Sequence, residues 1–537
     1  MPVHPYIFDS SHLRSFAQLR SMKRLYSTPP SDSHATTSGR NVRGCQHPYL
    51  CHFVNMILYQ VLRRITFNSL PIELQSEIFF FCVSPFPRFS TKEAPIVLAR
   101  VCSTWRSIVL SSPRLWSSFE VEIRGSGPSG LLHDARLMHR MKLWLYRSCC
   151  SPLSVRLVYN PVGRVSDDRS TQLLAELVSQ ARRWRNAHFT LPAASIAKLH
   201  PFPPNSFPIL RSITFKVTGG RFSPSDPPIN IFAMNIPWRQ LTGIDLQLEP
   251  SNLPTLDEAL DILSQSINLI YGTLHLECTW GRRDTLQDKL SLPTLDTLQL
   301  ILQDANGAAD RLEASLTQFL NLLCLPKLRV LHLGWLAHSN GESWSLANTD
   351  FIAFLRASAE TLRELTMTYL PISENELLEY LSQVPQLTHL DLRFALHEGA
   401  NDPITNRLLV ACTACSTSAY TEIPLLPRLE HVNLQCHGAL YANTTLLNFI
   451  QARWKSGKGS EGQDAARPLK HFGFLSMKPV PSEVEKRVKA WHEEGLEIDI
   501  HCLVVRWCVT VEMVYTIVYA ESAAECHVPK YFCVWTL

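Results

Sequence analysis

One spacing of apolar residues recurs between residues 210 and 474, as apolar-x-x-apolar-x-apolar. Apolar residues that alternate over a few positions favour a strand with one buried face. Nine copies, although irregularly spaced, indicate a repeat array. The nine strand motifs are Leu210/Ile213/Phe215, Leu241/Ile244/Leu246, Tyr271/Leu274/Leu276, Leu295/Leu298/Leu300, Leu328/Leu331/Leu333, Leu362/Leu365/Met367, Leu387/Leu390/Leu392, Leu429/Val432/Leu434 and Leu469/Phe472/Phe474.

Helical patterns lie between these strand motifs, and three of them begin with a possible capping box. A strand and a helix of this length cannot bury their apolar faces without neighbouring repeats. We therefore predict an α/β fold in which the repeats stack as one curved, parallel-stranded solenoid over residues 150–504. The three boxes are Thr255 with Glu258, Ser373 with Glu376 and Ser482 with Glu485.

Residues 66–119 have a different, purely helical pattern. Ser69 can cap a helix and Pro71 suits its first turn. Leu74, Ile78 and Phe81 fall on one face of that helix, and "IFFFCV" adds apolar residues around the remainder. A helical bundle of about fifty residues buries little of its own surface. We therefore expect an exposed apolar patch, which marks a binding surface.

A second helix is predicted within "VCSTWRSIVLSSPRLW" (101–116). Its apolar stripe consists of Val101, Cys102, Trp105, Ile108 and Val109. The proline at 113 ends the helix, and Leu-Trp follows at 115–116. The segment is too short to enclose its own indoles, so something else must cover them.

"LPIELQSEIF…APIVLARVCSTWRSIVLSSPRLWSSF" resembles an F-box. "MKLWLYRSCCSPLSVRLV" and "RWRNAHFTLP" are similar to segments that follow the F-box in proteins of mushroom-forming fungi, and the strand motifs resemble degenerate leucine-rich repeats. The resemblance implies a small F-box bundle that binds a Skp-type adaptor, and through it a cullin. The residues that it assigns to adaptor binding or support are Leu70, Pro71, Ile78, Val101, Cys102 and Trp105.

The resemblance also implies a non-catalytic role, as the substrate-recognition subunit of a cullin-RING ubiquitin ligase. The repeats would bind a target protein, whose identity the sequence does not give. The x positions of the strand motifs are the candidate target contacts. Those selected are Asp296, Gln299, His332, Arg363, Asp391 and Arg393.

Five segments are predicted in all. They are a basic leader (1–65), the F-box (66–119), a connecting segment (120–149), the repeats (150–504) and a C-terminal tail (505–537). The leader composition also suits a mitochondrial presequence, as the alternative to a disordered segment. In the tail region, "CLVVRWCVTVEMVYTIVYA" contains Arg506 and Glu512, which favours a buried strand pair over a membrane span.

Composition excludes some classes of partner. The net charge is +4, from 51 basic and 47 acidic residues, and the basic residues are scattered, so nucleic acid is not expected. Apolar residues make up 45% of the chain, typical of a folded protein. Fifteen cysteines show no framework spacing and no secretory signal precedes them. They indicate reduced thiols and a cytoplasmic or nuclear location.

Candidate chemistry was also considered. "RGSGPSG" contains Gly125-x-Gly127-x-x-Gly130 between a strand pattern and a helix pattern, as a dinucleotide site requires. The next strand ends in Tyr159-Asn160, where such a site needs an acidic residue. A nucleotide-binding enzyme is therefore an alternative hypothesis, as is a repeat scaffold that joins no ligase.

Neither cysteine cluster has the two tight ligand pairs typical of structural zinc. We expect no metal, no cofactor and no catalytic residue. The clusters considered were Cys412-x-x-Cys415 with Cys436 and His437, and Cys45, His47, Cys51 and His52.

Overall fold

The structure is a computed structural model of the whole chain. It describes residues 67–124, 130–160, 168–197, 199, 202–203, 205–217, 229, 231, 234–248, 252–280, 289–303, 312–336, 348–396, 402–413, 425–455, 467–510, 513–522 and 531–532. The chain divides into two compact units, Met1–Pro71 and Ile72–Leu537. In the first unit the described part contains a short 3-10 turn, Phe67–Ser69. The predicted leader, 1–65, lies outside the described residues, as do both of its interpretations and the cluster Cys45–His52.

The second unit begins with a helical segment, residues 72–116. Helix α3 (Ile72–Cys82) is followed by a 3-10 turn (Leu98–Arg100), α4 (Ser103–Ser111) and a second 3-10 turn (Pro113–Trp116). The sulfur of Cys102 accepts a hydrogen bond from the backbone N–H of Trp105 and so caps α4. Proline at 113 ends α4 because it has no N–H to donate. Val101 and Cys102 therefore precede the helix, which corrects their predicted place on its stripe.

Within the described residues, 13 parallel strands form one sheet and follow one another in chain order. Two further strands, β16 (Met513–Ser522) and β17 (Tyr531–Phe532), continue it antiparallel. The parallel strands are β1 (Ser118–Arg124), β2 (Leu153–Asn160), β3 (Trp184–Leu191), β4 (Ser212–Val217), β5 (Gly243–Gln247), β6 (Tyr271–Glu277), β8 (Thr297–Gln303), β10 (Val330–Trp335), β11 (Glu364–Thr368), β12 (His389–Arg393), β13 (His431–Cys436), β14 (His471–Ser476) and β15 (Glu497–Thr510). The short strands β7 (Leu290–Ser291) and β9 (Leu323–Cys324) pair separately.

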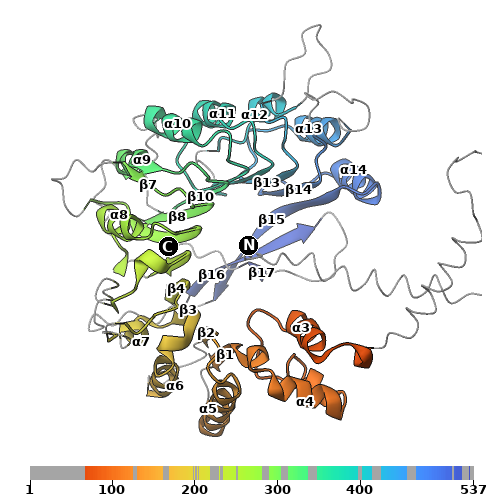
Figure 1. Ribbon diagram of the computed structural model, residues 1–537. Helices are drawn as coiled ribbons and strands as arrows, with labels where there is room; N and C mark the ends of the chain where they lie inside the picture. The colour runs from red at the N-terminus through yellow and green to blue at the C-terminus, as the bar shows by residue number, and fades with distance from the viewer. Residues whose placement is uncertain are drawn as a thin grey trace, which may run out of the picture. The chain divides into compact units, whose positions relative to one another are not determined.

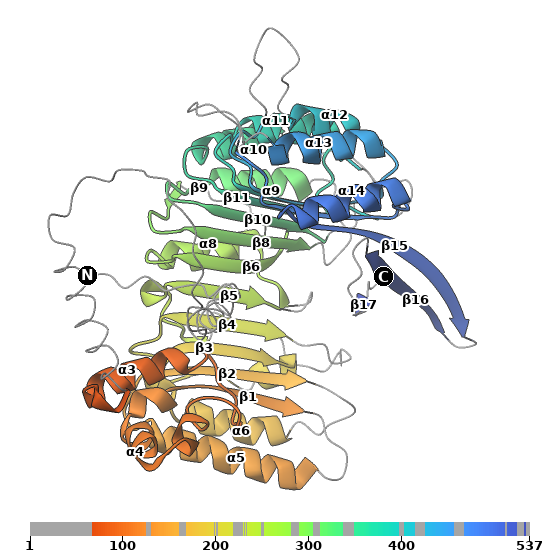
Figure 2. The same cartoon turned by 90° about the vertical axis from the view of Figure 1, so that its right-hand side faces the viewer.

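The helices that follow these strands cover one face of the sheet (Figures 1 and 2). The α/β class is therefore confirmed. They are α5 (Gly130–Arg147), α6 (Asp168–Val178), α7 (Ala193–Ala197), α8 (Leu256–Gln265), α9 (Leu312–Asn321), α10 (Asn348–Ala357), α11 (Glu374–Ser382), α12 (Asn406–Ala411), α13 (Asn443–Lys455) and α14 (Ser482–Glu493), with 3-10 turns at Ala181–Arg183 and Trp238–Gln240. None of the described helices is long and apolar enough to cross a bilayer.

Two of the three predicted capping boxes form. Thr255 and Ser373 cap α8 and α11, each with the glutamate three residues later. The third prediction is wrong, because α14 begins at Ser482 itself and Pro481 is its N-cap. Pro481 holds the extended backbone that an N-cap residue needs, so no serine side chain is used there.

The core between sheet and helices consists of two rows of in-register apolar side chains. In all nine predicted strand motifs, the fourth and sixth positions lie on a strand of the sheet. The first row is Phe119, Val155, Ala187, Ile213, Ile244, Gly272, Leu298, Leu331, Leu365, Leu390, Val432, Phe472 and Ile498, and the second is Val121, Leu157, Phe189, Phe215, Leu246, Leu274, Leu300, Leu333, Met367, Leu392, Leu434, Phe474 and Ile500.

One motif was placed two residues too late. Gly272, not Leu274, lies in the first row of β6, since it pairs with Ile244 and Leu298. The motif therefore begins at Leu269, which is buried. Tyr271 was predicted as a core residue, but it lies on the opposite face of the sheet.

Regular structure extends beyond the predicted repeats at both ends. The connecting segment, 120–149, contains most of β1 and α5, and the sheet therefore begins before residue 150. In the tail, β15 and β16 pair antiparallel over the apolar run, as the predicted strand pair requires. Nothing separates the helical segment from the sheet, because only Ser117 lies between Trp116 and the start of β1.

Candidate binding surfaces

An apolar patch lies on the helical segment. Phe81 is 81% exposed, and further large apolar side chains on α3 and on residues 97–110 are also exposed. The face of α3 that turns inward carries Gln75 and Phe79, and Phe79 contacts Trp105 with ring centroids 4.8 Å apart. The apolar patch consists of Ile72, Leu74, Ile78, Phe81, Val97, Val101 and Leu110.

The six residues that the resemblance assigns to adaptor binding differ in exposure. Ile78, Val101 and Cys102 are exposed on the second unit, and Trp105 is half-buried against Phe79. Leu70 and Pro71 belong to the first unit, where Leu70 is half-buried and Pro71 exposed. Ile78, Val101 and Cys102 can therefore contact a partner, whereas Trp105 holds α3 and α4 together.

The second half of the helical segment is covered by the chain itself. Trp116 is only 1% exposed, and its indole N–H donates to the carbonyl of Val109 over 2.8 Å. Trp144 of α5 packs edge-on against it at 4.8 Å, and Arg147 lies 4.4 Å over the same ring. The chain itself therefore covers the indole of Trp116, whereas the side chains of the apolar patch stay exposed.

Residues 85–90 fasten the helical segment to the start of the sheet. Arg88 forms an ion pair with Glu120 at 2.8 Å, and the ring of Phe86 packs edge-on against His188 of β3 at 4.9 Å. Arg156 lies over Phe86 at 4.2 Å and also pairs with Glu120. These contacts lie on the sheet face opposite α5–α14, so the helical segment and β1–β3 behave as one body.

That same face, opposite α5–α14, is polar along most of its length, and we call it the polar face. It consists of the residues that alternate with the two buried rows. Its central row is Glu120, Arg156, His188, Thr214, Asp245, Thr273, Gln299, His332, Thr366, Asp391, Asn433, Gly473 and Asp499.

Four of the six predicted target contacts lie on this face. Gln299, His332 and Asp391 share the central row, and the Arg393 guanidinium pairs with both carboxylate oxygens of Asp391 at 2.9 and 2.6 Å. Burial lowers the pKa of His332, and the nearby charge of Arg393 lowers it further. His332 is therefore a neutral hydrogen-bonding group at physiological pH, 3.4 Å from the Thr368 hydroxyl.

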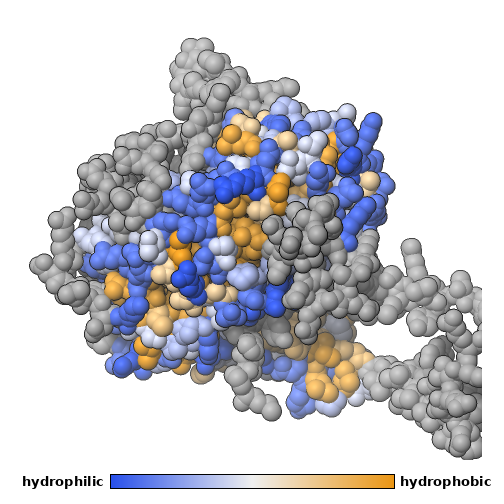
Figure 3. All heavy atoms as spheres, turned by 90° about the horizontal axis from the view of Figure 1, so that it is seen from above, coloured by the Kyte–Doolittle hydropathy of each residue, from blue (hydrophilic) through white to orange (hydrophobic). Residues whose placement is uncertain are grey.

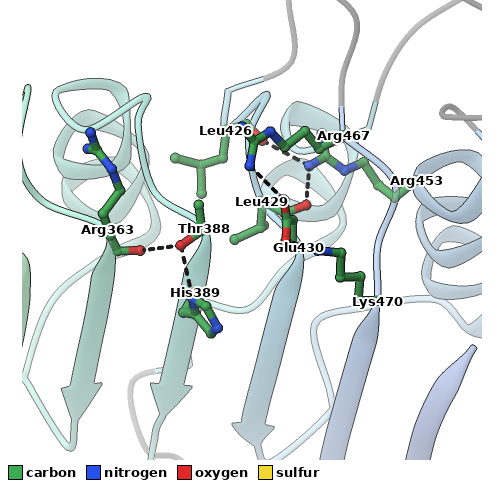
Figure 4. A network of polar contacts seen from close by, with 9 residues as sticks. All are labelled: Arg363, Thr388, His389, Leu426, Leu429, Glu430, Arg453, Arg467 and Lys470. Carbon is green, nitrogen blue, oxygen red and sulfur yellow. Dashed lines mark hydrogen bonds and ion pairs between the residues drawn. The ribbon is translucent and has the colours of Figure 1, made fainter. Parts of the chain in front are cut away.

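The other two predicted contacts, Asp296 and Arg363, immediately precede β8 and β11 and lie at the N-terminal ends of these strands. A polar network lies at the N-terminal ends of β12–β14 (Figure 4). Glu430 binds Arg467 at 2.7 Å and Lys470 at 2.5 Å. Burial acts to raise the pKa of Glu430, but these two cations outweigh it and lower that pKa. Glu430 is therefore a charged carboxylate whose two oxygens are both held in ion pairs.

Near the N-terminal end of β13, Arg453 of α13 is fully buried. One of its terminal nitrogens donates to the carbonyls of Leu426 and Leu429, at 3.0 and 2.8 Å (Figure 4). Its Nε and other terminal nitrogen have no hydrogen-bond partner among the described residues. The guanidinium fixes α13 to the turn that enters β13, which is a structural role.

Three histidines form a stack on the polar face at β12–β14. His389, His431 and His471 are in register on adjacent strands. The first two rings are parallel within 6° at 4.2 Å, and the second pair is 6.1 Å apart. Glu364 and Glu497 occupy the same row at its two ends, 3.9 and 4.0 Å from the nearest imidazole nitrogens. We call these five residues the histidine row.

The sequence analysis did not predict this row. A signal was present, because each histidine stands immediately before the fourth position of its strand motif, as in Leu387-x-His389-Leu390. Aligning the motifs at 387, 429 and 469 would have placed the three side chains in one column.

Tyr271 lies across the polar face because its neighbour on β5 is glycine. Gly243 pairs with Tyr271, and a Cβ atom at Gly243 would lie 1.9 Å from the ring. Burial raises the pKa of the Tyr271 phenol, a Ser212 hydrogen bond opposes this rise, and Asp245 adds to it. The phenol thus spans β5 and reaches β4.

We expect Gly243→Ala to destabilise the protein by about 1–3 kcal/mol, because the Tyr271 ring must leave its place. The control is Gly334→Ala, since a Cβ there meets its nearest atom at an ordinary 3.6 Å. Urea unfolding of both variants checks the prediction, and Tyr271→Ala in the Gly243→Ala background should recover part of the loss. Equal stability of the two glycine variants would contradict it.

Neither considered chemical site is supported by the described residues. Residues 125–129 of the glycine-rich loop lie outside them, and Gly130 begins α5. Cys412 and Cys436 are buried thiols whose pKa burial raises, while Cys415 lies outside the described residues. Among the described side chains no group of three or more histidine, cysteine or acidic residues is arranged to hold a metal ion.

Figure 3 shows hydrophobic side chains in several areas among hydrophilic ones on the face seen from above. Comparison with known proteins gives no family, because neither a protein-family model nor a curated protein matches this chain. A functional inference must therefore start from the apolar patch and the polar face.

Proposed function

We propose that this chain is the substrate-recognition subunit of a cullin-RING ubiquitin ligase. Its helical segment acts as an F-box that docks a Skp-type adaptor. Its strand–helix repeats act as a leucine-rich-repeat-like solenoid that holds a target protein. The chain itself performs no chemistry and raises the local concentration of the target near the transferring enzyme.

The observation that carries this proposal is the apolar patch. Seven large apolar side chains stay exposed on the helical segment, whereas its other half, around Trp116, is buried under α5. Several exposed large apolar side chains on one short helical segment favour a protein interaction site there. The sequence that carries the patch is also the one that resembles an F-box, which selects the Skp-type adaptor as the partner.

The polar face supports the second half of the proposal. Its side chains carry both charge signs, as in Glu120 and Arg156, and further along the sheet they include uncharged polar groups such as Gln299 and Thr366. A rigid sheet that presents many short polar side chains suits the recognition of a folded partner.

Phe81→Lys is expected to abolish co-purification of the Skp-type adaptor, with a loss of at least about tenfold, equivalent to about 1.4 kcal/mol. Phe81 is the penultimate residue of α3, where a lysine suits the helix dipole, so folding is preserved. The measurement is recovery of adaptor with tagged full-length protein, with the melting temperature as a folding check.

Leu440→Lys is the matched control, because Leu440 is an exposed apolar residue outside the patch. It should recover adaptor like the unmodified chain. Undiminished recovery with Phe81→Lys would show that the patch is not the docking site. Absence of adaptor from the unmodified chain would instead favour a scaffold outside a ligase.

A further inference from the structure

We propose that the histidine row is an acid-responsive binding site for an acidic, carboxylate-rich segment of a partner protein. The inference deepens the proposed receptor role, since it gives the chemistry of the target. It uses a surface on β11–β15, separate from the apolar patch on α3 and residues 97–110.

The stack brings three titratable rings within reach of one ligand. Parallel strands lie about 4.8 Å apart, which matches the 4.2 Å separation of the His389 and His431 rings. The side chain of His389 is 43% exposed and that of His471 is 22% exposed. The rings therefore meet solvent and can be reached by another chain.

Hydrogen bonds fix how the two outer rings are oriented. The Thr388 hydroxyl lies 3.1 Å from the carbonyl of Arg363, to which it donates, so it accepts from His389 Nδ1 at 2.9 Å (Figure 4). His471 Nε2 donates to the side-chain oxygen of Asn433 at 3.0 Å. A Cβ at Gly473 would lie 2.3 Å from that oxygen, so glycine is needed there. The row is thus held in place before any ligand arrives.

The geometry argues against a metal ion as the ligand. Imidazole nitrogens bind a metal along the ring plane, but His389 and His431 present parallel faces to each other. Their lone pairs therefore do not converge on one point. Protons are the cations that these rings can take up without moving.

Neighbouring charges decide what protonation does. Glu430 is occupied by Arg467 and Lys470, and Asp391 by Arg393. The carboxylates within the row itself are Glu364 and Glu497, which are 47% and 65% exposed and lie at its two ends, while Asp499 is exposed in the adjacent central row. The neighbours of His431 within the row are both histidines, so a charge on the central ring has no carboxylate beside it in the row.

The central ring accordingly resists protonation in the free protein. Burial lowers the pKa of His431, and the charges of His389, His471 and Lys470 lower it further, with Glu430 opposing them. A ligand carboxylate beside the stack would favour the charged rings and raise that pKa. Binding then takes up protons, so affinity must rise as the pH falls through the window between the free and bound pKa values.

The test uses the full chain and a fluorescent octaglutamate peptide, with binding followed by anisotropy at low salt. Glutamate stays ionised throughout, because its pKa is about 4.3. We expect binding to be about tenfold tighter at about pH 5.5 than at about pH 7.5, as one linked proton allows. Octalysine, at the same pH values, should not bind.

The double variant His389→Gln, His431→Gln should lose this acid response. The matched control is His139→Gln, His492→Gln, which removes one exposed histidine on α5 and one on α14, both outside the row and outside the polar face. It should keep the response, and circular dichroism confirms folding of both. Equal affinity at the two pH values, or a response retained without His389 and His431, overturns the proposal. Adaptor recovery, measured on the same variants, reports separately on the proposed ligase role.

Discussion

Trp116→Ala should lower the free energy of unfolding by about 3–5 kcal/mol, the usual cost of removing a buried tryptophan. The substitution would empty a site enclosed by Trp144 and Arg147. It would also leave the carbonyl of Val109 without the 2.8 Å hydrogen bond from the indole. Urea unfolding followed by tryptophan fluorescence and circular dichroism measures the change.

Tyr146→Ala is the appropriate control. Tyr146 lies on α5 like Trp144 but is 80% exposed, so its removal should change stability by no more than about 0.5 kcal/mol. A comparable loss of unfolding free energy in both variants would mean that α5 does not cover the helical segment at Trp116. The comparison also matters for adaptor binding, because a Trp116 variant that loses the adaptor would do so by unfolding.

Acidification should destabilise the start of the sheet through His188. Burial, with a contribution from Arg156, lowers the pKa of His188 to about 4, against about 6.5 in an unfolded chain. The unfolded state therefore binds the proton first as the pH falls. Stability contributed by neutral His188 is complete above about pH 6.5 and is lost between there and about pH 4, by about 3 kcal/mol in total.

His188→Gln should flatten this part of the stability profile, since glutamine does not titrate. The profile is obtained from urea unfolding at a series of pH values. The exposed His492, replaced by glutamine, should leave the acid loss unchanged. An identical acid loss in His188→Gln and the unmodified chain would assign the effect to other groups.

The sequence predicted the repeating part of the fold because each strand motif is a local pattern. Leu328/Leu331/Leu333 and its relatives are buried on one side by simple alternation, which needs no knowledge of neighbours. Tyr271 was misplaced because Gly272 has no side chain to mark its core position. The inward face of α3 was not predicted, since its apolar residues are not confined to one side of the helix and only the contact with Trp105 selects Phe79.

The binding surfaces were harder to predict because they depend on register between distant segments. Gln299, His332 and Asp391 were chosen correctly for the polar face by their positions inside strand motifs. Asp296 and Arg363 were misplaced because strands begin one residue after them. The cover over Trp116 could not be foreseen either, because Trp144 reaches it from a segment interpreted as a connection.

The contacts of Phe86 and Arg88 with His188 and Glu120 join the helical segment to the first strands of the sheet. In the proposed ligase, an adaptor bound to the helical segment would then keep one orientation relative to these strands. The lysines of a target bound beside them would reach the transferring enzyme only within a limited range of distance and angle. Position on the folded target, more than the residues beside the lysine, would then decide where ubiquitin is attached.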